Sequence, residues 1–147
     1  MHPFLVPGEW FLEGDYFPSG KKPQRLVGIT EVHASEEFPE TLQVTGEVRD
    51  AEVTGRPVPS TFHLDVIGPA TVRFRMDSIP LGTVLVGGGH FNDHALVLRY
   101  ASPDRRFVGV ESYVACGGGV IHYTGVILAD GAAVTSWLAR LERATPR

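Results

Sequence analysis

Apolar and polar residues alternate along several short stretches of the chain. In the segment 41–49, aliphatic residues fall on one face, at Leu42, Val44 and Val48, and polar residues fall on the other. A period of two is typical of an antiparallel strand with one buried face and one face in solvent. The same period recurs at 61–66 and 71–77. The pattern therefore predicts three half-buried strands.

Seven further segments carry a weaker strand pattern, and turn-forming residues separate them. These segments are 9–17, 25–33, 81–86, 91–100, 106–114, 120–128 and 132–143. Glycine, proline or aspartate marks the predicted turns at 18–20, 55–57, 68–69, 87–89, 102–104, 117–119 and 130–131. Asp130-Gly131 suits a two-residue type I′ hairpin, because both central residues of that turn need a positive φ.

The last segment also fits a helix. Apolar residues at 133, 134, 137, 138 and 141 form a helical stripe. A strand instead places Thr135, Trp137, Ala139 and Leu141 on one face, after a segment that resembles the first arm of a hairpin. We favour the strand and keep a short helix as the alternative.

About ten evenly spaced strands with no βαβ pattern indicate an all-β protein. An open sheet of that size would leave exposed edges, so the chain should close into a barrel or form a sandwich. The continuous hairpin order favours an antiparallel up-and-down β-barrel of about eight to ten strands, with residues 1–147 as a single domain. The 17 glycines and 11 prolines argue against long helices and fall mostly in the predicted turns.

Charge and cysteine content exclude several classes of protein. The 13 basic and 17 acidic residues give a net charge of −4, and the basic residues do not cluster, which argues against nucleic-acid binding. No apolar run approaches the ~18 residues that a membrane span needs. Cys116 is the only cysteine and the start lacks a signal-peptide pattern, so we expect a cytoplasmic protein. A homodimer stays an open alternative.

The first predicted strand contains Gly8-Glu9-Trp10. This triplet resembles the Gly-x-Trp signature that opens the calycin superfamily, which includes lipocalins, fatty-acid-binding proteins and nitrobindin-like barrels. The resemblance implies a calycin-like barrel in which a basic residue near the last strand packs on the tryptophan and closes one end. Arg140 and Arg143 are the candidates, and such a contact contributes ~0.5–2 kcal/mol.

Three polar residues fall on otherwise apolar faces of predicted strands. His94 shares a face with Leu96 and Leu98, His122 with Val120 and other aliphatic residues, and Glu111 with Phe107 and Tyr113. Unpaired polar groups are costly to bury, so these three should bond to each other, to water or to a ligand. In a partly dry cavity, His94, His122 and Glu111 are therefore the candidate catalytic residues for acid–base chemistry.

The sequence predicts neither a metal site nor a cofactor. His90 and His94 have a helical metal-ligand spacing, but on a strand they lie about 13 Å apart at ~3.3 Å per residue. His63 and Asp65 fall on the predicted solvent face. The calycin resemblance leaves haem binding through one axial histidine open, although no residue points to haem specifically. The glycines near His90 and Cys116 mark the predicted mouth of a cavity.

We therefore expect the barrel to bind a small hydrophobic or amphipathic molecule in its cavity. The residues expected to line the ligand site or to close the barrel are Trp10, Tyr16, Phe74, Tyr100, Tyr113 and Trp137. One alternative is an enzyme, a cyclase, isomerase or dehydratase that folds a polyketide- or polyene-like substrate in the same cavity. Another is an interaction domain whose interior is filled by side chains.

Overall fold

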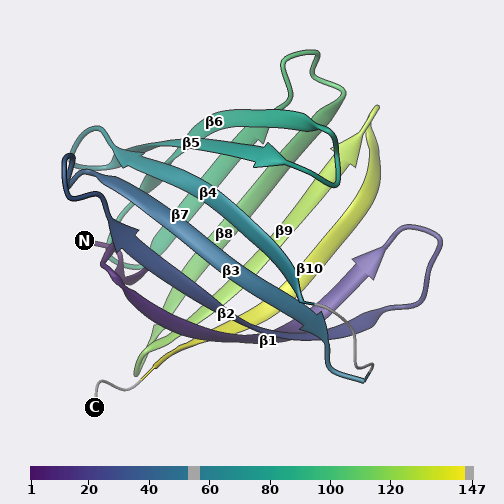
Figure 1. Ribbon diagram of the computed structural model, residues 1–147, viewed down its shortest axis with the longest axis horizontal. Coiled ribbons are helices and arrows are strands. Elements are labelled where there is room, and N and C mark those ends of the chain that lie inside the picture. The colour runs from purple at the N-terminus through teal and green to yellow at the C-terminus, as the bar shows by residue number, and fades with distance from the viewer. Residues whose placement is uncertain (53–56, 145–147) are drawn as a thin grey trace.

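Ten strands close into one antiparallel barrel in the computed structural model (Figure 1). The structure describes residues 1–52 and 57–144. Each strand pairs with the next along the chain, and β1 pairs with β10 to close the ring. A 3₁₀ turn, η1 (Pro3–Leu5), precedes β1. The strands are β1 (Gly8–Pro18), β2 (Gln24–Ala34), β3 (Thr41–Asp50), β4 (Val58–Val66), β5 (Thr71–Ser78), β6 (Thr83–Phe91), β7 (Ala95–Ala101), β8 (Phe107–Gly117), β9 (Val120–Ala129) and β10 (Ala132–Arg143).

The barrel confirms the all-β up-and-down prediction, including the strand favoured for the C-terminal segment. β10 pairs with β9 on one side and with β1 on the other, and this pairing overrides the helical stripe. Asp130 and Gly131 have φ values of 50° and 81°, as the predicted type I′ turn requires. In the described residues, no helix is both long and apolar enough to cross a membrane.

The predicted turn at 87–89 is wrong, because these three glycines lie inside β6. Gly87 and Gly89 face the barrel interior, where the backbone of β6 lies close to that of β7. A Cβ atom on Gly87 would lie 1.9 Å from the carbonyl oxygen of Arg99, and one on Gly89 would lie 1.9 Å from that of Val97. Only glycine permits such a close approach, so these glycines mark a tight contact between two strands and not a reversal of the chain.

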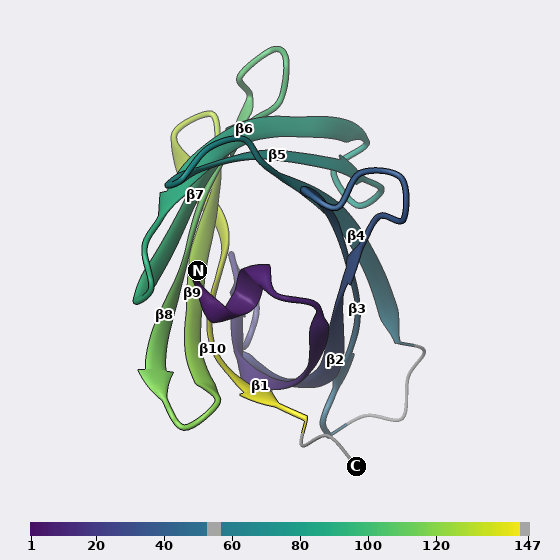
Figure 2. The same ribbon diagram turned by 90° about the vertical axis from the view of Figure 1, so that its left-hand side faces the viewer.

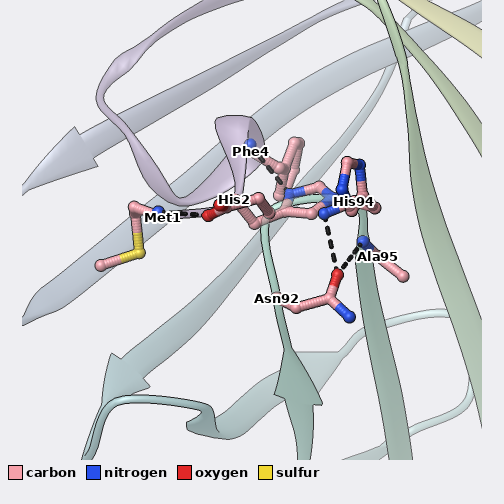
Figure 3. A network of polar contacts seen from close by, with 7 residues as sticks. Met1, His2, Phe4, Asn92, His94 and Ala95 are labelled. Atoms are coloured by element: carbon pink, nitrogen blue, oxygen red, sulfur yellow. Dashed lines mark hydrogen bonds and ion pairs between the residues drawn. The ribbon is translucent and has the colours of Figure 1, made fainter.

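The reversal comes instead at Asn92, within the segment 91–100 that the pattern assigned to one strand. The Asn92 side-chain oxygen accepts hydrogen bonds of 2.8 Å from the backbone N–H groups of His94 and Ala95 (Figure 3). An asparagine that bonds the backbone two and three residues ahead forms a turn without glycine. His94 therefore belongs to this turn and not to a strand.

One end of the barrel is closed by η1, which lies within the ring of strands (Figure 2). Phe4 is buried and stacks on Tyr113 with a centroid distance of 4.4 Å. His2 is also buried, and its Nε2 lies 3.0 Å from the Tyr113 carbonyl oxygen. Its Nδ1 accepts a 3.1 Å hydrogen bond from the Phe4 N–H (Figure 3). We call His2, Phe4 and Leu5 the plug.

The opposite end is open. Inward-facing Leu26, Val48 and Phe107 are only half-buried there, and Val58 is 55% exposed. β4 and β5 pair only from His63 to Val66 on the β4 side, so the rest of β4 separates from β5 towards this end (Figure 1). The mouth predicted near His90 and Cys116 is therefore at the wrong end, because the connections after β6 and β8 lie beside the plug.

Trp10 is fully buried beside the plug, and a basic residue covers it as the Gly-x-Trp resemblance implied. The Arg143 guanidinium carbon lies 5.3 Å from the Trp10 ring centroid, and Arg143 donates a 3.0 Å hydrogen bond to the Pro7 carbonyl. Arg140 lies on the outer wall, 3.7 Å from Glu142. Of the two candidates, Arg143 therefore closes the barrel.

Candidate binding site inside the barrel

Glu111 lies on the interior face of β8 and is the centre of a buried polar cluster. The Tyr100 and Tyr123 hydroxyls donate to its Oε1 at 3.0 and 3.1 Å, and the Tyr113 hydroxyl donates to its Oε2 at 3.2 Å. These residues come from three neighbouring strands, β7, β8 and β9. We call Glu111, Tyr100, Tyr113 and Tyr123 the carboxylate cluster. It confirms the predicted inward orientation of Glu111.

Two glycines make room for the large side chains around Glu111. Gly109 is paired with Tyr100, and an added Cβ would lie 2.1 Å from the Tyr100 ring. Gly125 is paired with both Glu111 and Trp137, and its added Cβ would lie 2.2 Å from the Trp137 ring. The rings therefore lie flat across bare backbone, which leaves space for a carboxylate between them.

Aromatic rings surround the carboxylate cluster on both sides. Tyr113 and Tyr123 stack at a centroid distance of 4.4 Å, and Trp137 packs tilted against Tyr123 at 5.7 Å. On the other side Phe74 stacks on Tyr100 at 4.4 Å. Rings in such arrangements contribute stability beyond their buried area and lose little conformational freedom, so they hold the hydroxyls in place.

Burial determines the acid–base properties of the cluster. Loss of hydration raises the pKa of the Glu111 carboxyl, and the three tyrosine hydrogen bonds oppose this by favouring the carboxylate. Burial, followed by the charge of Glu111, raises the pKa of Tyr100, Tyr113 and Tyr123. The tyrosines therefore stay protonated as donors, and Glu111 is a weaker acid than a glutamate in water.

A cavity of about 110 Å³ lies inside the barrel beside this cluster. Tyr113 and Tyr123 form part of its wall, so the cavity and the carboxylate cluster share two residues. The other lining residues are mostly apolar and come from the plug, β1, β2, β3, β4 and β10. They are Phe4, Leu12, Thr30, Val44, Gly46, Val48, Ser60, Phe62 and Leu141.

All six predicted ligand residues lie on inward-facing positions. Trp10 belongs to the plugged end, whereas Tyr16 and Trp137 are paired across β1 and β10 in the open half. Phe74, Tyr100 and Tyr113 form or border the carboxylate cluster. The indole N–H of Trp137 and the hydroxyl of Thr135 are buried without a hydrogen-bond partner, which leaves two polar groups in the open half for a ligand or water.

The inward orientation predicted for His94 and His122 is wrong. His94 is exposed in the turn between β6 and β7, and His122 is exposed on the outer wall. β9 carries aliphatic residues on both faces, so the alternation of its residues does not determine which face points inward. The prediction placed His122 on the inward face of β9, whereas the structure places Tyr123 there. Neither histidine can act on a molecule inside the barrel.

The outer wall carries wider but shallower hollows. One, of about 540 Å³, lies over Gly88 between β6 and β8, and another, of about 370 Å³, lies across β2, β3 and β4. Neither contains a buried polar cluster like that around Glu111. Within residues 1–52 and 57–144, no group of three or more His, Cys, Asp or Glu side chains is placed to hold a metal ion.

No family model matches the sequence, and neither does any curated protein. Two solved structures share the fold over nearly the whole chain. An S-type phycobiliprotein lyase, CPES from Guillardia theta, matches with a TM-score of 0.73 and 12% identity, covering 98% of this chain and 91% of its own. Rv2717c from M. tuberculosis matches with a TM-score of 0.75 and 18% identity, covering 95% and 93%. These likenesses show the fold, a closed antiparallel barrel of the kind that the Gly-x-Trp triplet suggested.

Proposed function

We propose that this barrel binds a small hydrophobic or amphipathic molecule in its interior. The observation that carries the proposal is the asymmetry of the barrel. One end is sealed by the plug, whereas the other admits solvent to an interior of aromatic and aliphatic side chains around a cavity. Sites for small molecules are usually concave and mostly apolar, with few polar groups that fix orientation.

The size of the cavity limits how the ligand would bind. Ligand sites usually occupy ~300–1,000 Å³, whereas an apolar cavity of ~150 Å³ holds benzene. The space of about 110 Å³ beside Tyr113 and Tyr123 is smaller than that cavity, so it suits a short chain or part of one ring. A larger molecule would place only one end in this space and extend the rest of its length towards the open end of the barrel.

A cavity-filling substitution tests the proposal. N-phenyl-1-naphthylamine, a neutral apolar fluorophore, should bind the wild-type protein saturably with an increase in emission. Val48 lines the cavity near the open end, so Val48→Trp should weaken this binding at least about tenfold. Arg49→Trp adds the same ring to the outer face of the same strand and should leave binding unchanged. Absence of saturable binding, or equal binding by both variants, would contradict an interior site.

The buried carboxyl supports a second candidate function, an enzyme of the cyclase or isomerase type. A glutamate whose pKa is raised by burial can exchange a proton with a bound substrate near neutral pH. The Guillardia theta relative in fold is named as a lyase, which is consistent with enzymatic use of such an interior. Of the three predicted catalytic residues, we assign this role to Glu111, because it faces the interior whereas His94 and His122 are exposed.

A further inference from the structure

Glu111 is a buried acidic group that no basic residue of the described chain contacts. The residue is 7% exposed, and its hydrogen-bond partners are three neutral hydroxyls. The ion pairs that arginine side chains form lie on the outer wall or between the turns after β7 and β9. A carboxylate offers about four lone-pair sites, of which the tyrosines fill three. One acceptor position on Oε2 is therefore left for another donor.

The basic groups nearest the interior cannot neutralise Glu111. Arg143 lies over the Trp10 ring at the plugged end and donates to the Pro7 carbonyl. Both ring nitrogens of His2 are already hydrogen-bonded, to the Tyr113 carbonyl and the Phe4 N–H, and burial lowers its pKa, which favours the neutral imidazole. Within the described residues, no positive group therefore lies against the Glu111 carboxyl.

The surroundings of the carboxylate also favour a cation. The faces of tyrosine and tryptophan rings attract positive charge, most strongly where water is excluded. Tyr113 and Tyr123 line the cavity and bond directly to Glu111, and Trp137 packs against Tyr123. A group at the inner end of the cavity would thus meet the two tyrosine rings whose hydroxyls bond the Glu111 carboxyl.

From this arrangement we infer that the ligand carries a protonated nitrogen on an apolar body, and that this nitrogen is the group bound beside Glu111, Tyr113 and Tyr123. The inference rests on the proposed function and adds the chemical class of the ligand. A ligand carboxylate in the same place would face Glu111 without a compensating charge, so acidic ligands of equal size should be rejected.

Three probes of nearly equal size test the inference, namely benzylamine, benzyl alcohol and benzoate. Each would compete with N-phenyl-1-naphthylamine at a pH where benzylamine is protonated. The wild-type protein should bind benzylamine at least about tenfold more tightly than benzyl alcohol, and benzoate most weakly. Glu111→Gln keeps the shape of the side chain and removes its charge, so it should abolish the preference for the amine while the neutral fluorophore still binds.

Two controls keep the test decisive. Glu47→Gln makes the same change on the outer face of β3, so the preference for benzylamine should persist. If Glu111→Gln does not fold, the carboxyl carbon resonance of Glu111 in the wild-type protein gives the answer: it should shift with benzylamine and not with benzyl alcohol. Equal affinities, or tighter binding of benzoate, overturn the inference while the interior site stands. Failure of the fluorophore and all three probes to bind overturns both.

Discussion

The position of Trp137 depends on the absence of a side chain at Gly125, and this dependence can be measured. A Cβ atom added to Gly125 would lie 2.2, 2.6 and 2.9 Å from three atoms of the indole, whereas ordinary contact begins at 3.4 Å. In Gly125→Ala the ring has to retreat by more than an ångström. Overpacking of this kind typically costs ~1–3 kcal/mol, so the free energy of unfolding should fall by about that amount.

The same substitution should behave differently once the ring is gone. In a Trp137→Ala background the added methyl group meets no indole, and alanine in a strand is favoured over glycine by roughly 0.5–1 kcal/mol. Gly125→Ala should then be neutral or slightly stabilising. A double-mutant cycle should therefore give a coupling free energy of at least about 1 kcal/mol between the two positions.

Urea unfolding followed by circular dichroism measures all four proteins, and Trp10 remains as a fluorescent reporter where Trp137 is removed. Gly68→Ala is the matched control, because nothing lies within 4 Å of its added Cβ. It should change stability by less than ~0.5 kcal/mol. If Gly125→Ala has the same cost with and without Trp137, to within ~0.5 kcal/mol, the ring does not rest on Gly125 and the geometry given for the site is wrong.

Two further predictions concern the plugged end. Arg143→Ala should lower the free energy of unfolding by ~0.5–2 kcal/mol through loss of the contact with Trp10. Arg140→Ala on the outer wall should change it by less than ~0.5 kcal/mol. Equal effects of the two substitutions in urea unfolding would argue against the contact. Burial lowers the pKa of His2 from 6.5, so below about pH 6.5 the unfolded chain takes up a proton that the folded chain resists, and stability should fall. His2→Gln should lose this part of the pH dependence, and an unchanged slope between pH 7.5 and 5.5 would show that His2 does not cause it.

Much of the fold could be predicted from alternation and turn residues. The strands whose two faces differ in polarity, such as 41–49 and 71–77, were predicted with the correct inward face. Asp130-Gly131 was a reliable turn signal because its backbone requirement is local. The stretch 87–89 misled for the opposite reason: its glycines are required by close contact with backbone carbonyl groups of β5 and β7, and these contacts form only when the strands pair.

The candidate site could be predicted only in part. Glu111 was predicted to face inward because the residues that share its face of the strand, Phe107 and Tyr113, are aromatic. His122 was predicted to face inward in place of Tyr123, because both faces of β9 are apolar and the sequence there does not show which face is buried. The plug was missed altogether, since His2 and Phe4 belong to no periodic segment and are buried by contacts far along the chain, such as those with Tyr113.

The carboxylate cluster is difficult to explain as a device for stability. Replacing a buried charged network with apolar side chains of similar volume is often neutral or stabilising, and the plugged end already has a dense apolar core around Trp10 and Leu96. A barrel selected only to fold would place leucine and phenylalanine where Glu111 and its tyrosines stand. The cluster lies instead where the closed core ends and the cavity begins, which is the place where the polar end of a bound molecule would come to rest.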